Sequence, residues 1–307
     1  MKLALKIDVD TYRGTLVGVP QLVALLRRFE VQASFFFSLG PDHTGRAVMR
    51  AFRPGFFSKV KRTSVLSHYG LKTLLYGTLL PSPDIGRSCA DIMKSVADAG
   101  HEVGIHCWDH IRWQDGVAAA DQAWTESQLE KACTRYGDIF GAAAKSHAAA
   151  GWQMNAHALR LTQRLGFTYA SDTRGTHAFM PVCDGELVVC PQLPTTLPTL
   201  DEIIGQDGIN PGNAHETLLK ATIQGEPQDH VYTLHAELEG QKLAPVLERL
   251  LIGWRGQGYH LCSMQELRAD LDLAKLPRHE VIRGSIPGRS GTLMLQGEEF
   301  LASATTP

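Results

Sequence analysis

Two pairs of polar side chains in this sequence have the spacing that metal chemistry requires. Asp8 and Asp10 stand two residues apart near the beginning of the chain, and His106 and His110 stand four residues apart about a hundred residues later. Two imidazoles and one carboxylate are a common ligand set for Zn²⁺ and similar cations, with one position left for water. The sequence therefore predicts a divalent metal site formed by both histidines and one of the two aspartates.

Catalysis at such a site needs proton transfer as well as a cation. The aspartate that does not bind the cation can act as general base toward an attacking water molecule, and His235, late in the chain, can act as general acid. Each motif is weak alone, because a short DxD is often only a polar strand end and an HxxxH pair is more often structural. Their occurrence at the ends of three expected strands favours an amide hydrolase.

The elements that would hold these residues alternate between strands and helices. Strands are expected at residues 3–10, 31–39, 102–105, 168–171, 187–190, 231–234 and 260–263, and helices at 20–29, 87–99, 118–140, 155–165 and 245–258. A strand places Asp8 and Asp10 on one face, since successive side chains alternate. Repeated strand–helix units with polar residues at strand ends predict an α/β barrel with its site at the carboxyl ends of the strands.

Composition places the chain among ordinary globular proteins. It has 307 residues, 44% of them hydrophobic, and a formal net charge of −2. So small a charge gives no overall attraction to nucleic acid, and no such partner is expected. We find no secretory signal and no apolar run of the roughly 18 residues that a spanning helix needs. The six cysteines show no paired spacing, which suits reduced thiols, so we expect a cytoplasmic protein without a transmembrane helix.

One segment departs from the alternation of strands and helices. Residues 43–83 contain seven lysines and arginines but no aspartate or glutamate, and large apolar side chains are interleaved with the basic ones. This pattern is typical of a segment that lies on an anionic membrane surface. The alternative is a helical excursion whose apolar side packs on the barrel, and amphipathicity alone does not separate the two.

On these residues, the chain resembles the polysaccharide deacetylase (NodB-homology) family. IDVD near the start, HxxxH and a late LH follow the order of that family's motifs, and the resemblance implies a distorted (β/α)7 barrel. The blocks KIDVDTYRGTLVGVP, EVGIHCWDHIRWQ, SHAAAGW, SDTRG, PTTLPTLDE and YTLHAELEG are more narrowly similar to one branch of the family. That branch removes the formyl group from 4-deoxy-4-formamido-L-arabinose carried on undecaprenyl phosphate, a step in lipid A modification and polymyxin resistance.

The resemblance extends from the first strand to IRGSIPGRSG and implies how the chain is divided. One deformylase domain is expected at residues 1–275, with the basic and apolar insertion at 43–83, followed by a C-terminal tail at 276–307. The lipid-linked substrate implies a peripheral protein on the inner membrane, docked through the insertion.

The resemblance also implies a role for each motif residue. Asp8 would be the general base, His235 the general acid, and Asp10, His106 and His110 the metal ligands. Asp8 and Asp10 could exchange roles, because the wider family has adjacent acids where this chain has DVD. Asp172 falls where the family keeps an acid that pairs with the catalytic histidine. The ligand set suits Zn²⁺ and also accepts Mn²⁺, Co²⁺ or Fe²⁺.

One residue of the family pattern is missing from this chain. The family has an arginine that orients the base, and SHAAAGW, which has none, stands in its place. Arg174 or Arg13 would then orient the base. The expected substrate contacts are Tyr12, Trp108, Ala149, Gly151 and Glu237. The small side chains of residues 148–150 would leave a narrow pocket suited to a formyl group.

Two other functions stay open at this point. One is deacetylation of another amino sugar, and the second is lipid binding by a catalytically silent protein of the same fold. The basic and apolar insertion favours a lipid-linked substrate over an extracellular polymer.

Overall fold

The computed structural model describes residues 1–47 and 72–301 of the chain. Its centre is a curled parallel sheet in the order β5-β4-β3-β2-β1-β8, with β9 paired to the beginning of β1. The strands are β1 (Lys2–Val9), β2 (Ser34–Ser38), β3 (Glu102–Cys107), β4 (Ser146–His147), β5 (Tyr169–Ala170), β8 (His230–His235) and β9 (His260–Cys262). The expected α/β barrel is confirmed, in the form of an open, curled half-barrel.

Strand β1 organises the sheet because both of its faces are buried. Its odd-numbered residues, such as Leu5 and Ile7, belong to the large core between the sheet and the helices, whereas Ala4 belongs to a second cluster inside the barrel. Side chains alternate along a strand. Lys6 and Asp8 therefore share the inward face with Ala4.

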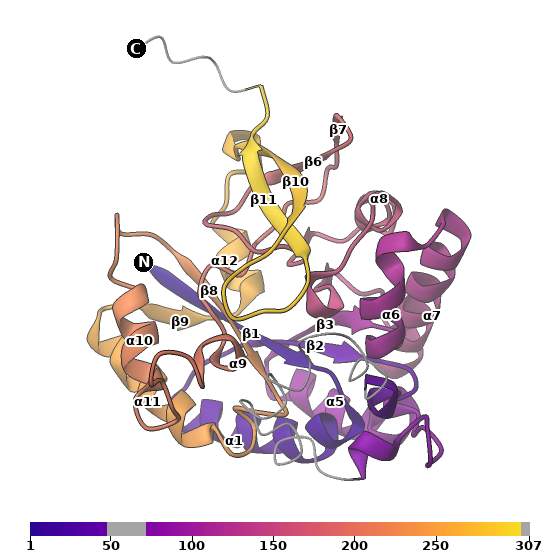
Figure 1. Ribbon diagram of the computed structural model, residues 1–307, viewed down its shortest axis with the longest axis horizontal. Helices are drawn as coiled ribbons and strands as arrows, with labels where there is room; N and C mark the ends of the chain where they lie inside the picture. Colours follow the sequence, from indigo (N-terminus) through magenta and orange to yellow (C-terminus); the bar gives the residue numbers. More distant parts are fainter. Residues whose placement is uncertain (48–71, 302–307) are drawn as a thin grey trace.

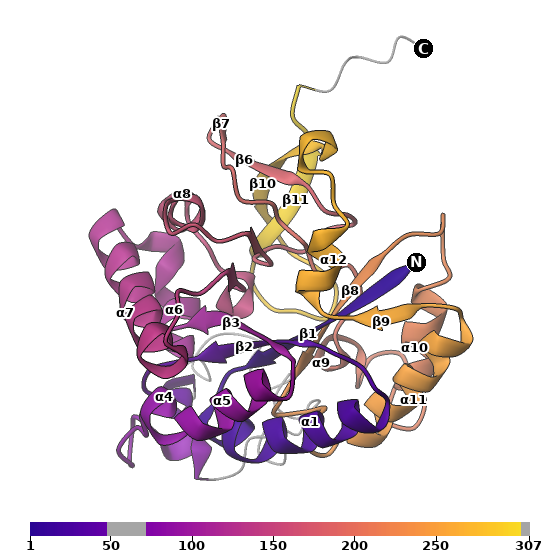
Figure 2. The same cartoon turned by 180° about the vertical axis from the view of Figure 1, so that it is seen from behind.

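Helices cover the outer face of the sheet (Figures 1 and 2). The helices are α1 (Val19–Arg28), α4 (Ile85–Ser88), α5 (Ala90–Asp98), α6 (His110–Gly116), α7 (Gln122–Phe140), α8 (Ala156–Arg164), α9 (Leu200–Ile203), α10 (Ala214–Ala221), α11 (Ala244–Gly256) and α12 (Met264–Ala269). The exception to this placement is α12, whose Met264 and Leu267 pack in the cluster inside the barrel. The long helices are amphipathic, as α1 shows by burying Leu22, Leu25 and Leu26. Among the described residues, no helix combines the length and the apolar character that crossing a membrane requires.

An irregular segment at residues 191–196 fills the gap between the edge strands β5 and β8. On one side, Ala170 N donates to Pro191 O at 2.9 Å and Leu193 N donates to Ala170 O at 2.8 Å; on the other, Thr196 N donates to Val231 O at 3.1 Å. Pro191 and Pro194 have no N–H to donate, so the segment cannot form a regular ladder. Loop backbone therefore bridges the gap that the strands of the half-barrel leave open.

A second sheet, in the order β11-β10-β6-β7, stands on the opposite side of the barrel from α1 and α5 (Figures 1 and 2). Its strands are β6 (Met180–Cys183), β7 (Glu186–Leu187), β10 (Arg278–Gly284) and β11 (Leu293–Glu299). No strand is expected from the sequence in the tail at 276–307, yet β10 and β11 form there, and β11 is hydrogen-bonded to the barrel, since Arg174 N donates to Met294 O at 2.9 Å.

The strand expected at residues 187–190 is wrong in its extent. Strand β7 covers only Glu186 and Leu187, and it forms a hairpin with β6. The turn between them is Asp184–Gly185, and both residues have positive φ, 52° and 78°. Asp-Gly is a strong signal for such a two-residue turn, and it was available in the sequence.

Candidate metal centre

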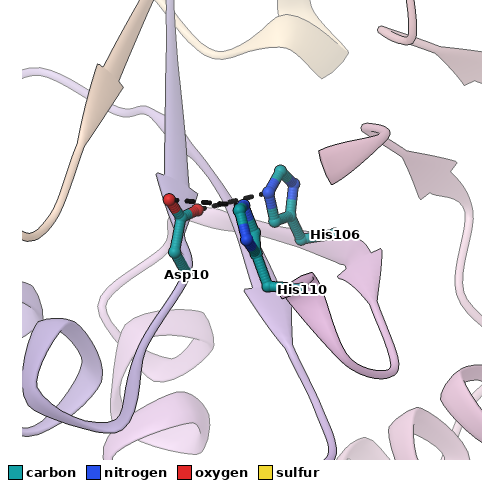
Figure 3. Close-up of side chains that lie close together, drawn as sticks. All are labelled: Asp10, His106 and His110. Atoms are coloured by element: carbon teal, nitrogen blue, oxygen red, sulfur yellow. Dashed lines mark ion pairs between the residues drawn. The ribbon is translucent and has the colours of Figure 1, made fainter. Parts of the chain in front are cut away.

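Three of the predicted ligands meet at the carboxyl ends of the strands (Figure 3). Asp10 directly follows β1, His106 lies in β3, and His110 is the first residue of α6. His106 Nε2 lies 3.2 Å from Asp10 Oδ1, and His110 Nε2 lies 3.4 Å from Asp10 Oδ2. One atom from each of the three side chains lies within 4.8 Å of the others, which is the spacing of groups that share one cation.

The local sequence explains why the two imidazoles face the same point. Asp109 caps α6, because its Oδ1 accepts a hydrogen bond from Arg112 N at 3.1 Å, and its Oδ2 lies 2.5 Å from His43 Nδ1. This cap fixes where the chain turns from strand to helix. The rings of His106 and His110 consequently stack, with centroids 5.3 Å apart.

The buried polar atoms of this cluster fit a divalent cation. Asp10 Oδ1 and both ring nitrogens of His106 are buried, and no hydrogen-bond partner is found for them among the described residues. Leaving such groups unsatisfied costs free energy. One ring nitrogen from each of His106 and His110, with one carboxylate oxygen of Asp10, is a donor set that Zn²⁺ and similar ions take. Burial raises the pKa of Asp10, but the imidazoles, His110 first, lower it below its usual value, which keeps the carboxylate ionised.

Asp8 lies beside the centre, and only one of its two carboxylate oxygens is directed toward it. Its Oδ1 is 3.8 Å from His106 Nδ1, and its Oδ2 is 3.4 Å from Lys6 Nζ. Asp10, in contrast, approaches both imidazoles, as described above. The two aspartates share one face, as the spacing predicted, and the geometry favours Asp10 as the ligand and Asp8 as the base.

His235 ends β8, next to Asp8 in the register of the sheet. Its Nδ1 lies 3.8 Å from Asp201 Oδ1, and its backbone N donates to Glu239 Oε2 at 2.9 Å. Burial lowers the pKa of the imidazole, but the surrounding carboxylates, Asp201 first, outweigh burial and raise the pKa to about 9. The side chain therefore carries a proton at neutral pH, as a general acid must.

The predicted pairing of Asp172 with His235 is wrong. Asp172 Oδ1 instead lies 2.8 Å from His147 Nδ1 and accepts a hydrogen bond from Ala149 N at 2.9 Å. Asp172 thus fixes the loop that follows β4. The carboxylate that pairs with the imidazole of His235 is Asp201, at the start of α9, and nothing in its local sequence pattern relates it to β8.

The predicted role of Arg174 or Arg13 beside the base is also wrong. Arg174 Nη1 pairs with Glu202 Oε1 at 2.6 Å, and its Nη2 donates to Leu197 O at 2.9 Å. Arg13 Nε donates to Gln241 Oε1 at 3.0 Å. Among the described residues, the lysine or arginine that pairs with Asp8 is Lys6. The alternation of Lys6, Asp8 and Asp10 along one strand is the signal that could have identified it.

Two expected substrate contacts, Tyr12 and Trp108, are half-buried near the ligands. Trp108 lies between the two histidines in sequence, and the guanidinium of Arg135 stacks over its ring at 5.1 Å. Gly151 has φ 61°, a backbone conformation in which any other residue would be strained, and a Cβ there would lie 2.6 Å from Gln114 Nε2. Contact of these residues with substrate stays a prediction.

Glu237 holds the ligand loop from inside the protein. Its Oε1 accepts hydrogen bonds from Asp10 N at 3.1 Å and from Thr11 N and Thr11 Oγ1, both at 2.8 Å. Burial, followed by the charge of Asp10, raises the pKa of Glu237 to about 8. This observed role is to position Asp10, and contact with substrate is not needed to explain the residue.

The basic and apolar segment begins and ends beside the centre. Residues 48–71 of the expected 43–83 segment lie outside the described residues. Its two ends are joined, because Asp42 N donates to Pro83 O at 2.9 Å and Ile85 N donates to Gly40 O at 2.8 Å. Gly40 N in turn donates to Trp108 O at 2.8 Å. The segment therefore leaves the barrel next to the loop that carries His110.

Comparisons with known proteins identify a family and several relatives. Residues 13–170 match the polysaccharide deacetylase family. A protein of Shewanella sediminis, assigned as the 4-deoxy-4-formamido-L-arabinose-phosphoundecaprenol deformylase ArnD, is 40% identical over 96% of this chain and 94% of its own length. A protein of Wigglesworthia glossinidia brevipalpis with the same assignment is 31% identical over 92% of this chain and 98% of its own length. The crystal structure of a Mycobacterium smegmatis protein assigned as a polysaccharide deacetylase has a TM-score of 0.62 at 19% identity, covering 93% and 94% of the two chains.

The ligand assignment predicts how substitutions change metal affinity. His106→Ala and Asp10→Ala should each weaken binding of Co²⁺ or Zn²⁺ by roughly 100-fold or more, since each removes a ligand rather than an outer contact. Titration of the metal-free protein by calorimetry or by Co²⁺ absorption measures this. His157→Ala, in α8, is the control and should bind as the wild type does. Equal affinities in all four proteins would contradict the assignment.

Proposed function

The chain belongs to the polysaccharide deacetylase family, and from this membership we propose that it hydrolyses the formamide of 4-deoxy-4-formamido-L-arabinose carried on undecaprenyl phosphate. The products would be formate and the lipid-linked 4-amino-4-deoxy-L-arabinose, for lipid A modification and polymyxin resistance. The observation that carries the proposal is the convergence of Asp10, His106 and His110 beside two further titratable groups, in a chain 40% identical to a relative so assigned.

A divalent cation held by Asp10, His106 and His110 would polarise the formyl carbonyl and acidify the attacking water. We propose Zn²⁺ as the native ion, because two imidazoles and one carboxylate match its preferred catalytic ligand set, while Mn²⁺, Co²⁺ and Fe²⁺ accept the same donors.

The protein's own groups then move the protons. The oxygen of the water bonds to the formyl carbon and gives a tetrahedral intermediate, while Asp8 takes a proton from that water. His235, protonated at neutral pH, gives its proton to the sugar nitrogen as the C–N bond breaks and formate leaves. The two groups lie on neighbouring strands, which places them on the same side of the barrel mouth.

A backbone N–H of the loop after β4 would stabilise the oxyanion, a contact typically worth roughly 3 kcal/mol. Ala148 N and Ala149 N already donate to Ile105 O and Asp172 Oδ1. We therefore place the donor later in this loop. We propose that the formyl group lies beside this donor, because the residues at 148–150 are all alanine and present little bulk.

The activity is tested by formate release from the lipid-linked formamido sugar, or from a short-chain analogue, by the metal-loaded protein. Asp8→Asn should lower kcat by roughly 10²- to 10⁴-fold with little change in KM, because the variant keeps the shape of the base but cannot accept the proton. Asp98→Asn, at an exposed position, is the control. Acetate release from an acetamido sugar with no formate release would favour the deacetylase alternative, and release of neither would favour the silent lipid-binding protein.

The raised pKa of His235 predicts how activity falls at alkaline pH. The imidazolium is present below a pKa of about 9 and is lost as the pH rises through that value, so kcat/KM should fall there. Asp201→Asn removes the carboxylate that raises this pKa, so the limb should move to lower pH, by about one unit. Asp207→Asn, exposed in the following loop, should leave it unchanged, and an unmoved limb in Asp201→Asn would contradict the assignment.

We further propose that residues 43–83 dock the protein on the anionic surface of the inner membrane. The substrate keeps its lipid in the bilayer, so hydrolysis has to occur at the interface. The segment is rich in basic and apolar residues, and both of its ends lie beside the metal centre, so docking would bring the barrel mouth to the lipid head group.

Membrane docking is tested by flotation with vesicles that contain anionic lipid. Replacing Lys59, Lys61 and Arg62 by glutamate should abolish co-flotation at physiological salt, because each basic residue near the surface contributes about 1 kcal/mol. The matched control replaces Arg268, Lys275 and Arg278, far along the chain, by glutamate. Unchanged flotation of the first variant would support packing of the segment on the barrel instead.

A further inference from the structure

We propose that Lys6 is a positioning residue for the hydrolysis, whose buried ammonium group holds the carboxylate of Asp8 in the orientation that the base requires. The inference rests on the proposed function, because it takes Asp8 as the base. It assigns to this lysine the task that an arginine performs elsewhere in the family and that neither Arg174 nor Arg13 performs here.

The contacts of Lys6 fix its position from three parts of the barrel. Its Nζ lies 3.4 Å from Asp8 Oδ2 on its own strand, and it donates to the carbonyl oxygen of Ser171, just after β5, at 3.1 Å. The same atom lies 5.1 Å from the centre of the Trp152 ring, in the loop after β4. The side chain is fully buried, so its ammonium group is held in one position.

Burial of the Lys6 charge lowers the stability of the folded protein, so a role in catalysis would explain why the lysine is there. Taking a lysine ammonium group out of water is unfavourable, and hydrophobic residues of similar volume often replace a buried ion pair without loss of stability. Burial lowers the pKa of Lys6, while the charges of Asp8 and Asp172 oppose this shift.

The two carboxylate oxygens of Asp8 have different surroundings. Oδ2 faces Lys6, whereas Oδ1 is buried toward His106 and has no hydrogen-bond partner among the described residues. A carboxylate held by one oxygen presents the other in a fixed direction. Oδ1 is therefore the atom that takes the proton from water, and Lys6 determines where this atom points.

The test compares Lys6→Met with Lys2→Met, a lysine of the same strand that pairs at the surface with Glu266 and Asp270. Lys6→Met should lower kcat by about 100-fold, the loss expected for a misplaced catalytic group, with KM and Co²⁺ affinity within threefold of the wild type. Lys2→Met should keep wild-type kcat. Lys6→Arg, which keeps the positive charge, should recover part of the loss.

A merely structural lysine is excluded by the double variant. If Lys6 acts through Asp8, Lys6→Met should have little further effect on kcat in the Asp8→Asn background, because residues of one catalytic unit are not additive. In urea unfolding of the metal-free proteins, Asp8→Asn should destabilise the wild-type background but not the Lys6→Met background, where no buried ammonium is left unpaired. Lys6→Gln serves for kinetics if Lys6→Met does not fold.

The outcomes separate this inference from the proposed function. If the wild type releases no formate, the proposed function fails, and the unfolding cycle still tests the pairing of Lys6 with Asp8. If the wild type releases formate and Lys6→Met retains its kcat, or lowers kcat equally with and without Asp8, the positioning role of Lys6 is overturned and the function stands.

Discussion

The inward face of β1 is the constraint on which the rest of the structure depends. Lys6, Asp8 and Asp10 follow one another at alternate positions, so all three charges point toward the barrel interior while Leu5 and Ile7 enter the core under the helices. A shift of the strand by one residue would exchange these two sets. Burial on both faces therefore fixes the register of β1, and the register places Asp8 and Asp10 beside the imidazoles of β3 and α6.

The two sides of the centre are built in different ways. The ligand side is compact, because Asp109 caps the helix that begins with His110 and Glu237 binds the loop that begins with Asp10. The acid side is assembled from distant segments. Asp201 reaches His235 only because the proline-containing segment at 191–196 bridges the gap between β5 and β8 and leads directly into α9.

The second sheet supports this acid side. The loop between β10 and β11 brings Arg289 to Glu202, the neighbour of Asp201, and Arg174 binds the same carboxylate oxygen. Both guanidinium groups also lie over the ring of Trp152, at 5.0 and 4.4 Å from its centre. The C-terminal hairpin is thus part of the framework that holds α9 in place.

The sequence by itself determined the features that depend on short-range pattern. Alternation placed Asp8 and Asp10 on one face, apolar periodicity gave most of the barrel strands and long helices, and the motif order gave the three ligands that the structure brings together. Only the tertiary structure decided the partners of those groups. Asp172 binds His147 rather than His235, Arg174 binds Glu202 rather than Asp8, and β10 joins β6 across about a hundred residues. The physical reason is that such pairings are set by how the strands close into a barrel, and no local periodicity carries that information.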